Sequence, residues 1–251
     1  MIVRGLLNKT RKTERGASRF RTAPAVRAAP FALLMLLMAP IPDVLGQAPQ
    51  TTKSAPDLAG VYQIASSGTV LPGGLKNAGS PADLALLPAA AQQMKSVDRK
   101  QDPAKVCAPV GPFRMMAWEE NKIELIPARG TIVMLFEDLS HGVLRTIYLN
   151  RGHTEKFEAN WMGDSVGRWE GDTLVVDTVG FNDKTWLNSA GAQHSDALHL
   201  VERIRPVLDG KYLEYKMTVE DPKTLTKPYT YTRYYEKLKT EIQENMCQDE
   251  Q

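Results

Sequence analysis

Histidines and carboxylates gather in the second half of the chain, at the ends of segments with a strand pattern. His153 follows the Asn150-Arg-Gly152 turn, and His194 precedes the segment that carries Glu202. An imidazole titrates near neutral pH, and a histidine beside a carboxylate is the ordinary means of moving a proton at pH 7. We therefore take His153, His194, Glu202 and Asp164 as candidate catalytic residues. The alternative for either histidine is a capping or surface role.

Glu202 gives the sharpest single inference. Alternation along the segment Leu198–Ile204 places this carboxylate on the same face as the leucines and the isoleucine. A carboxylate in apolar surroundings is costly unless it is paired or protonated, and such surroundings are also where general acids and bases arise. Two interpretations stay open: Glu202 is a catalytic group, or it forms a structural ion pair with an arginine from a neighbouring strand, such as Arg233 or Arg145.

Two other chemistries are weaker. The string Gly163-Asp-Ser-Val-Gly167 matches the nucleophile elbow of serine hydrolases, but that elbow needs a buried strand before it and a helix after it. Here polar residues precede Ser165 and a Trp-Glu-Gly-Asp turn follows it, so the glycines and polar residues are more simply turn chemistry. A metal held by His153, His194 and an acid is conceivable. However, no His-x-His or His-Glu-x-x-His spacing occurs, so we predict neither a metal nor an organic cofactor.

Aromatic side chains and one arginine are candidate substrate-binding residues. Aromatics either fill the core of a β-barrel or line a pocket that suits an apolar, aromatic or sugar ring. Arg203, beside Glu202, would position a substrate together with Asp164. The predicted substrate-binding set is Trp161, Trp169, Trp186, Arg203 and Tyr231.

The elements that must position these residues are mostly strands. Short β-type runs separated by Gly, Asn and Asp turns predict a mainly β fold, an antiparallel up-and-down barrel or sandwich. Ser80-Pro81 is typical of a helix start, which predicts one or two short helices within residues 80–98, kinked or split at Pro88. The candidate strands are 57–62, 122–127, 131–137, 144–149, 173–178, 198–204, 212–219 and 229–235.

The N-terminus predicts export. Eight Lys or Arg and one acid within the first thirty residues precede an apolar run, Phe31–Ala39, and small residues follow near Gly46-Gln47-Ala48. This is the pattern of a secretory signal peptide, and the run is too short for a membrane-spanning helix of about 20 residues. We predict a signal peptide at 1–48, a linker at 49–56, a single β-rich domain at 57–251, and a periplasmic or secreted protein without an integral membrane span after cleavage.

Composition excludes one class of partner. The chain has a formal net charge of +2, but residues 1–48 carry eight basic and two acidic side chains, which leaves 23 basic and 27 acidic ones in the mature protein. A weakly acidic chain lacks the clustered basic face that nucleic-acid recognition needs. The predicted partner is a small-molecule ligand or substrate, and the sequence leaves the oligomeric state open.

The two cysteines are Cys107 and Cys247. Export to an oxidising compartment permits a disulfide between them, and closing so long a loop constrains the unfolded chain by about 4–5 kcal/mol on the entropy model. The alternative is two free buried thiols.

Two resemblances add to these inferences. The segment Asp57-Leu-Ala-Gly-Val-Tyr62, at the head of an up-and-down β pattern, resembles the Gly-x-Trp opening of lipocalin-like (calycin) barrels, with Tyr62 in place of Trp. The core Gly163–Thr178 (GDSVGRWEGDTLVVDT), with Trp186, His194 and Glu202-Arg203, resembles a set of exported bacterial proteins with no assigned activity. The first resemblance implies a ligand-holding barrel, and the second implies a family but no function.

Three functions follow from these residues. The first is an exported acid/base enzyme for a small molecule, an isomerase, lyase or hydrolase without organic cofactor, in which His153 or His194 moves the proton and Glu202 orients or shares it. The second is a lipocalin-like periplasmic carrier that holds a small apolar, aromatic or sugar ligand without catalysis. The third is a purely structural or interaction domain of the cell envelope. The density of ionisable residues favours the enzyme slightly.

Overall fold

The computed structural model describes residues 54–137, 143–156 and 158–243. The leader, most of the linker and Cys247 lie outside them, so the signal peptide, the localisation, the domain limits and the Cys107–Cys247 disulfide stay predictions. None of the helices in the described part of the chain has the length and apolar character that a membrane crossing requires.

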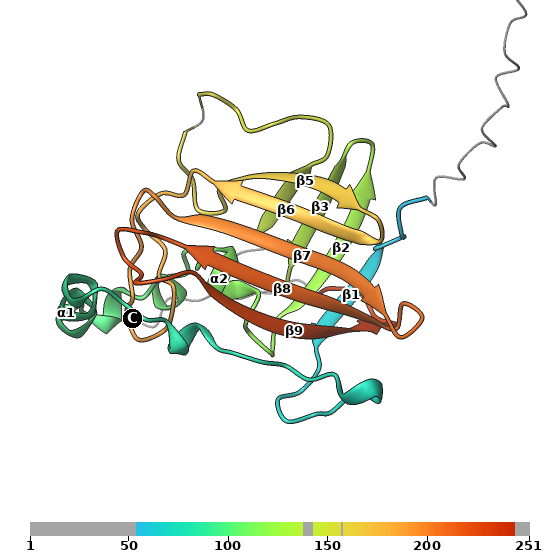
Figure 1. The fold of residues 1–251 in the computed structure, drawn as a ribbon, viewed down its shortest axis with the longest axis horizontal. Coiled ribbons are helices and arrows are strands. Elements are labelled where there is room, and N and C mark those ends of the chain that lie inside the picture. The colour runs from blue at the N-terminus through green and yellow to red at the C-terminus, as the bar shows by residue number, and fades with distance from the viewer. Residues whose placement is uncertain (1–53, 138–142, 157, 244–251) are drawn as a thin grey trace, which may run out of the picture. The chain divides into compact units, whose positions relative to one another are not determined.

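Nine strands form a closed barrel in chain order (Figure 1). The prediction of a mainly β fold is confirmed, and of the two predicted architectures, barrel or sandwich, the structure is the barrel. Most predicted strands begin and end within a few residues of the observed ones. The strands are β1 (Gly60–Ile64), β2 (Lys122–Ala128), β3 (Thr131–Phe136), β4 (Leu144–Tyr148), β5 (Asp164–Glu170), β6 (Thr173–Val179), β7 (His199–Val207), β8 (Tyr212–Glu220) and β9 (Tyr229–Leu238).

β5 is the one strand that the sequence did not predict. The glycines of this stretch are typical of turns, but only Gly163 and Gly171, which flank the strand on either side, have a positive φ. Gly167 is a strand residue with another purpose. A Cβ at this position would lie 2.8 Å from side-chain atoms of Ile147 and Leu149, so the glycine lets β5 approach the interior closely.

Nine strands cannot alternate in direction all the way around a closed ring, because an odd ring contains at least one pair of neighbours that run the same way. That pair is β4 and β5, where Ile147 lies opposite Ser165 and Tyr148 opposite Val166. We call this pair the parallel seam. Residues 149–163 connect its two strands, in place of the tight hairpin that joins antiparallel neighbours. The other eight neighbouring pairs, including β1 with β9, are antiparallel.

The helices are short. Ser80 accepts a hydrogen bond from the backbone N–H of Ala82 and caps a 3-10 turn at Pro81–Asp83, as the Ser80-Pro81 pair predicted. Pro88 does not kink a helix; it occupies the first position of α1 (Pro88–Ser96), where its missing N–H costs nothing. The sequence did not predict α2 (Pro112–Met115). Further 3-10 turns lie at Pro72–Gly74, Arg99–Gln101 and Pro103–Val106.

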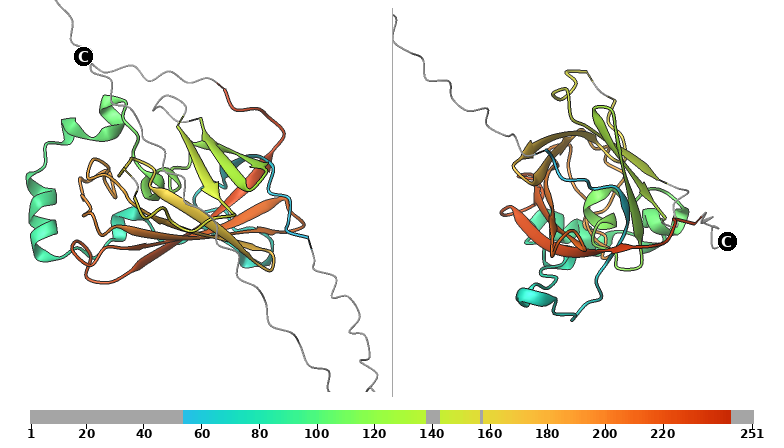
Figure 2. Two further views of the ribbon diagram at one scale, coloured as in Figure 1. Left: turned by 90° about the horizontal axis from the view of Figure 1, so that it is seen from above. Right: turned by 90° about the vertical axis from the view of Figure 1, so that its right-hand side faces the viewer.

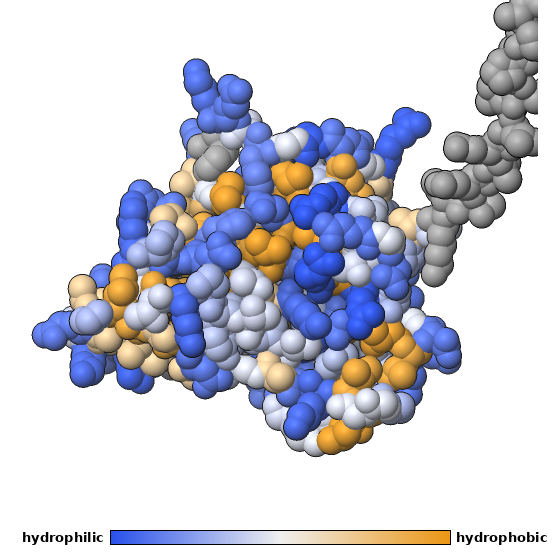
Figure 3. Space-filling view, in the orientation of Figure 1, coloured by the Kyte–Doolittle hydropathy of each residue, from blue (hydrophilic) through white to orange (hydrophobic). Residues whose placement is uncertain are grey.

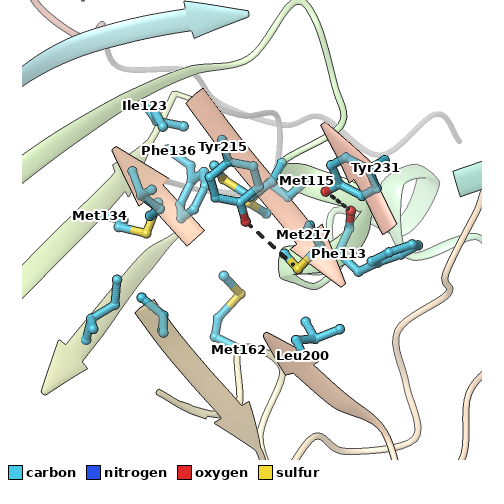
Figure 4. Close-up of a cluster of buried hydrophobic side chains, with 14 of the residues drawn as sticks. Phe113, Met115, Ile123, Met134, Phe136, Met162, Leu200, Tyr215, Met217 and Tyr231 are labelled. Carbon is cyan, nitrogen blue, oxygen red and sulfur yellow. Dashed lines mark hydrogen bonds between the residues drawn. The ribbon is translucent and has the colours of Figure 1, made fainter. Parts of the chain in front are cut away.

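α2 lies inside the ring of strands (Figure 2, right), and all four of its residues are buried. Tyr231 donates a hydrogen bond to the carbonyl of Phe113, and Tyr235 to that of Met116, each at 2.7 Å. These hydroxyls satisfy carbonyls that such a short helix leaves unpaired. Figure 4 shows Phe113 beside Tyr231 and Met217, within the buried cluster. This part of the barrel interior is therefore filled by the protein itself.

The outward faces of the strands are more polar than the barrel interior. Figure 3 shows mostly hydrophilic residues over the strands that face the viewer, with apolar residues scattered between them. On β7 the alternation is as predicted, since Glu202 is 0% exposed whereas the side chain of its neighbour Arg203 is 46% exposed.

Candidate functional site

Glu202 is paired with Arg145 inside the barrel. β7 places the carboxylate and β4 places the guanidinium on the inner face, and the two groups form a two-pronged ion pair. One contact joins Arg145 Nη1 to Glu202 Oε1 at 2.9 Å, and the other joins Nη2 to Oε2. Of the two partners named from the sequence, Arg145 is the one that the fold supplies.

All five N–H groups of Arg145 have an acceptor. Besides the carboxylate, Nε donates to Ser165 Oγ at 2.9 Å, Nη2 to Thr178 Oγ1 at 2.8 Å, and Nη1 to the sulfur of Met134 at 4.0 Å. Ser165, the residue of the nucleophile-elbow string, is thus a buried strand residue that accepts from an arginine. The described strand β5 leads into β6 and not into a helix, so the elbow geometry is not present here.

The carboxylate is equally occupied. Tyr215 donates to Glu202 Oε1 at 2.5 Å. Burial, and then the charge of Glu202, raise the pKa of Tyr215 well above its usual value, so the phenol stays a donor. Burial alone would lower the pKa of the Arg145 guanidinium, but Glu202 reverses this and raises it. Glu202 is 0% and Arg145 1% exposed, so neither group is open to solvent. Their geometry is that of a saturated structural ion pair.

His194 is also fully engaged. Its Nδ1 lies 2.8 Å from the carbonyl oxygen of Ser195, which can only accept, so Nδ1 carries the proton. Nε2 then accepts from Thr185 Oγ1 at 2.7 Å. Burial lowers the pKa of His194 below its usual 6.5, which keeps the ring neutral at pH 7. With both nitrogens used by the protein, His194 fastens the segment between β6 and β7 and has no proton site left for a ligand.

His153 belongs to a separate cluster on the outer face of the barrel. Its Nδ1 lies 3.1 Å from Asp164, and its Nε2 lies 2.8 Å from Asp177, a diagonal neighbour of Asp164 on β6. Asp177 in turn contacts His199 at 3.0 Å. Thus His153, His194 and Glu202, predicted as one site, have no partner in common. Among the described residues, no group of histidines, cysteines and acids has the geometry to hold a metal ion.

Asp164 is held ionised. Arg151 contacts both of its carboxylate oxygens, and the backbone N–H of Thr154 donates to it at 3.2 Å. The hydrogen bonds from Arg151, together with His153, lower the pKa of Asp164 to about 2, against the opposing effect of burial. Asp164 therefore anchors the segment after β4 to β5 and is a poor proton acceptor at neutral pH.

The predicted substrate-binding residues are dispersed. Arg203 points outward and pairs with Glu170 at 2.9 Å. Tyr231 lies inside the barrel against α2, as described above. Trp186 is buried, and Trp161 and Trp169 are partly buried and pack against the main core. The structure does not bring these five side chains to one place.

A cleft of about 400 Å³ lies between α2, the segment 77–82 and the inward face of β9. Segments far apart in the sequence form it. Its lining combines hydroxyl and amide side chains with one indole and three charged groups: Ser67, Asn77, Ser80, Asn188, Ser189, Trp118, Arg114, Glu119 and Arg233.

Two of the three charged groups have partners. Arg114 forms a two-pronged ion pair with Asp102, at 2.7 and 2.9 Å. Glu119 accepts from the backbone N–H and the hydroxyl of Ser67. The third, Arg233, forms no ion pair with any carboxylate of the described residues.

Arg233 is 7% exposed, and its hydrogen bonds to other described residues run from Nη1 to the carbonyls of Ala78, Gly79 and Thr232, at 2.9 to 3.2 Å. Its Nε is buried without a partner. A buried donor without an acceptor costs about 1–3 kcal/mol, and more when it is charged. Sequence reasoning named Arg233 only as a possible partner of Glu202. Arg233 lies two residues from both Tyr231 and Tyr235 in the sequence, so the alternation of a strand places it on the same face as these aromatic residues.

No family model and no curated protein matches the sequence. Comparison with solved structures finds small barrels. These include a fatty acid transporter, REP1-NXSQ (12% identity, 73% of this chain and 98% of that one, TM-score 0.36). Another is a zebrafish ileal bile acid-binding protein complexed with cholic acid (10% identity, 72% and 98%, TM-score 0.33). A third is a mutant of the fluorescent protein UnaG (10% identity, 73% and 97%, TM-score 0.34). Similarity at this level carries no argument about the ligand of this chain.

Proposed function

We propose that this protein is a carrier that binds a small polar molecule, such as a sugar, in the cleft between α2 and β9 and does not transform it. The observation that carries this proposal is the state of Arg233. The candidate catalytic side chains Glu202, His194 and Asp164 are bonded to internal partners, whereas Arg233, in the lining of the cleft, keeps a donor without an acceptor among the described residues.

The composition of the cleft supports a polar ring rather than a fatty chain. Trp118 offers an aromatic surface, and the hydroxyls of Ser80 and Ser189 line the same cleft. The amides of Asn77 and Asn188 are bonded to backbone groups and shape its polar wall. Binding sites commonly combine a ring-stacking surface with a few placed polar groups in this way. The basic leader and the apolar run after it support the placement of this carrier in the periplasm or outside the cell.

A filled-cleft variant tests the proposal. The mature chain, residues 49–251, is titrated by calorimetry with a panel of neutral sugars, sugar acids and sugar phosphates, and with oleate as an apolar probe. Ala82 lines the cleft and is exposed, so Ala82→Trp fills the space without disturbing the core. We expect at least one polar probe to bind, and Ala82→Trp to weaken its binding at least tenfold.

The matched control is Ala89→Trp, on the exposed surface of α1 and outside the cleft lining, which should leave binding unchanged. Mass spectrometry of the bound probe after prolonged incubation checks for turnover. Conversion of the probe, or binding of oleate alone, contradicts a polar-ligand carrier. If Ala82→Trp binds as the unchanged protein does, the ligand lies elsewhere.

A further inference from the structure

The guanidinium of Arg233 forms no ion pair with a carboxylate of the described residues. Of the other charged groups that line the cleft, Arg114 is neutralised by Asp102, and the carboxylate of Glu119 is bonded to Ser67 and forms no ion pair with Arg233. A buried guanidinium is normally paired with a carboxylate or phosphate, because removal of a lone charge from water is costly. Arg233 therefore brings into the cleft a fixed positive charge that forms no ion pair with any carboxylate of the described residues, Glu119 included.

The arginine is also held in place. Three backbone carbonyls bind Nη1, and the guanidinium carbon lies 4.9 Å from the centre of the Tyr231 ring, in a cation–π contact. These contacts fix the plane of the group before any ligand arrives, so little side-chain entropy is lost on binding. The donors that remain are those of Nη2, beside the unpaired Nε.

We propose that Arg233 makes the cleft selective for a small molecule that carries an anionic oxygen group, a carboxylate or a phosphate. This inference rests on the proposed function and names the ligand class of the same site. The anion accepts from Nη2 of Arg233 and forms the ion pair that this arginine lacks among the described residues, while the polar side chains and Trp118 hold the neutral part of the molecule. Hydrogen bonds to a charged acceptor are stronger and shorter than neutral ones.

The test compares matched probes on the mature chain. D-glucuronate and D-glucose 6-phosphate each differ from D-glucose by one anionic group, and calorimetry at low salt gives the three dissociation constants. We expect at least one acidic probe to bind about ten- to a hundredfold tighter than D-glucose, the gain of one hydrogen bond to a charged group. Which acidic probe wins distinguishes a carboxylate ligand from a phosphate ligand.

Arg233→Gln should abolish this preference, so that the acidic probes bind no more tightly to this variant than D-glucose does. Arg203→Gln is the matched control, because it removes an arginine from the exposed face of β7 and should leave all three constants unchanged. If Arg233→Gln does not fold, the unchanged protein still decides: a rise of NaCl from about 50 to 500 mM should weaken only the acidic probes, since salt screens charge.

The outcomes separate the two proposals. Equal affinity for the acidic probes and D-glucose, or a preference that survives Arg233→Gln, overturns the anion selectivity and leaves a neutral-ligand carrier standing. If no polar probe binds at all, the carrier itself is overturned and the selectivity with it.

Discussion

Arg145 and Arg233 are both buried on the inner side of the barrel, yet they stand in opposite chemical states. Arg145 has a carboxylate partner and an acceptor for each of its five N–H groups. Arg233 has three carbonyl partners, no ion pair among the described residues and an unpaired Nε. Burial alone is therefore not the sign of a site. What marks a site is a buried charge that the fold does not satisfy.

We expect the largest effect on stability at Arg145, the arginine whose N–H groups all have acceptors. Arg145→Met leaves Glu202 as a buried, uncompensated carboxylate, so we expect a loss of about 3–5 kcal/mol in the free energy of unfolding, measured with urea. The double variant Arg145→Met/Glu202→Leu removes both charges and should recover most of this loss, because a buried pair is often replaceable by apolar residues. A double variant as unstable as the single one would contradict this account of the pair.

Both ring nitrogens of His194 have hydrogen-bond partners, as the N–H groups of Arg145 do, but His194 carries no charge. It therefore shows what satisfied hydrogen bonds contribute without an ion pair. His194→Ala removes two buried hydrogen bonds and an edge contact with Phe181, for a loss of about 2 kcal/mol by urea unfolding at pH 7.5, with ligand binding unchanged. Burial lowers the pKa of this ring in the folded state. Stability from the neutral ring is thus complete above about pH 6.5 and falls as the unfolded histidine takes up a proton below it.

That slope should be absent from His194→Ala and present in His199→Ala, which removes a partly exposed histidine of the outer cluster. A catalytic role for His194 would instead appear as lost turnover with unchanged stability.

Arg233→Met makes the same substitution at the arginine that has an unpaired donor and no ion pair among the described residues. It forfeits three hydrogen bonds to carbonyls but relieves an uncompensated charge and an unpaired donor. We expect the free energy of unfolding to fall by at most about 1 kcal/mol. The two arginine variants are compared by urea unfolding under the same conditions. A loss of about 3–5 kcal/mol in both would mean that Arg145 and Arg233 contribute equally to stability, and would contradict the difference in pairing between them.

Asp164 gives a smaller, pH-dependent effect. Its pKa lies at about 2 in the folded protein, below the ordinary 3.8, so its stabilising contribution is present above pH 3.8 and is lost as the pH falls through about 2. Because Arg151 is one-third exposed, we expect Asp164→Asn to cost about 1 kcal/mol at pH 7 and only a small part of that at pH 2. Unfolding curves at both values test this, and Asp209→Asn, in an exposed turn, should show no such difference.

The smallest effect is expected next to Glu202 in the chain. Arg203→Gln breaks an exposed ion pair with Glu170 and should leave the midpoint of urea unfolding nearly unchanged. A loss of several kcal/mol would mean that an ion pair on the outer face of this barrel stabilises the protein as much as a buried one.

Alternation predicted much of the fold, including the inward Glu202 and the outward Arg203, because a strand's period of two follows from its backbone. It failed at β5, where three glycines within nine residues look like turns, although Gly167 is there to make room for Ile147 and Leu149. The cleft was not predictable. Its walls come from segments that only the closed barrel brings together, and an unpaired Nε is a property of the packed structure.

The long connection across the parallel seam also offers a place where the chain can be opened in a circular permutant. Val61 lies opposite Leu238, so the first and last strands of the ring begin and end side by side. A circular permutant that joins these ends by a short linker and opens the chain between residues 155 and 156, both exposed, would cut the connection between β4 and β5 and leave every hairpin whole. Exposed connections of this kind are where permutation is tolerated. The odd strand number thus gives this barrel a natural second pair of termini, on a segment remote in sequence from the cleft.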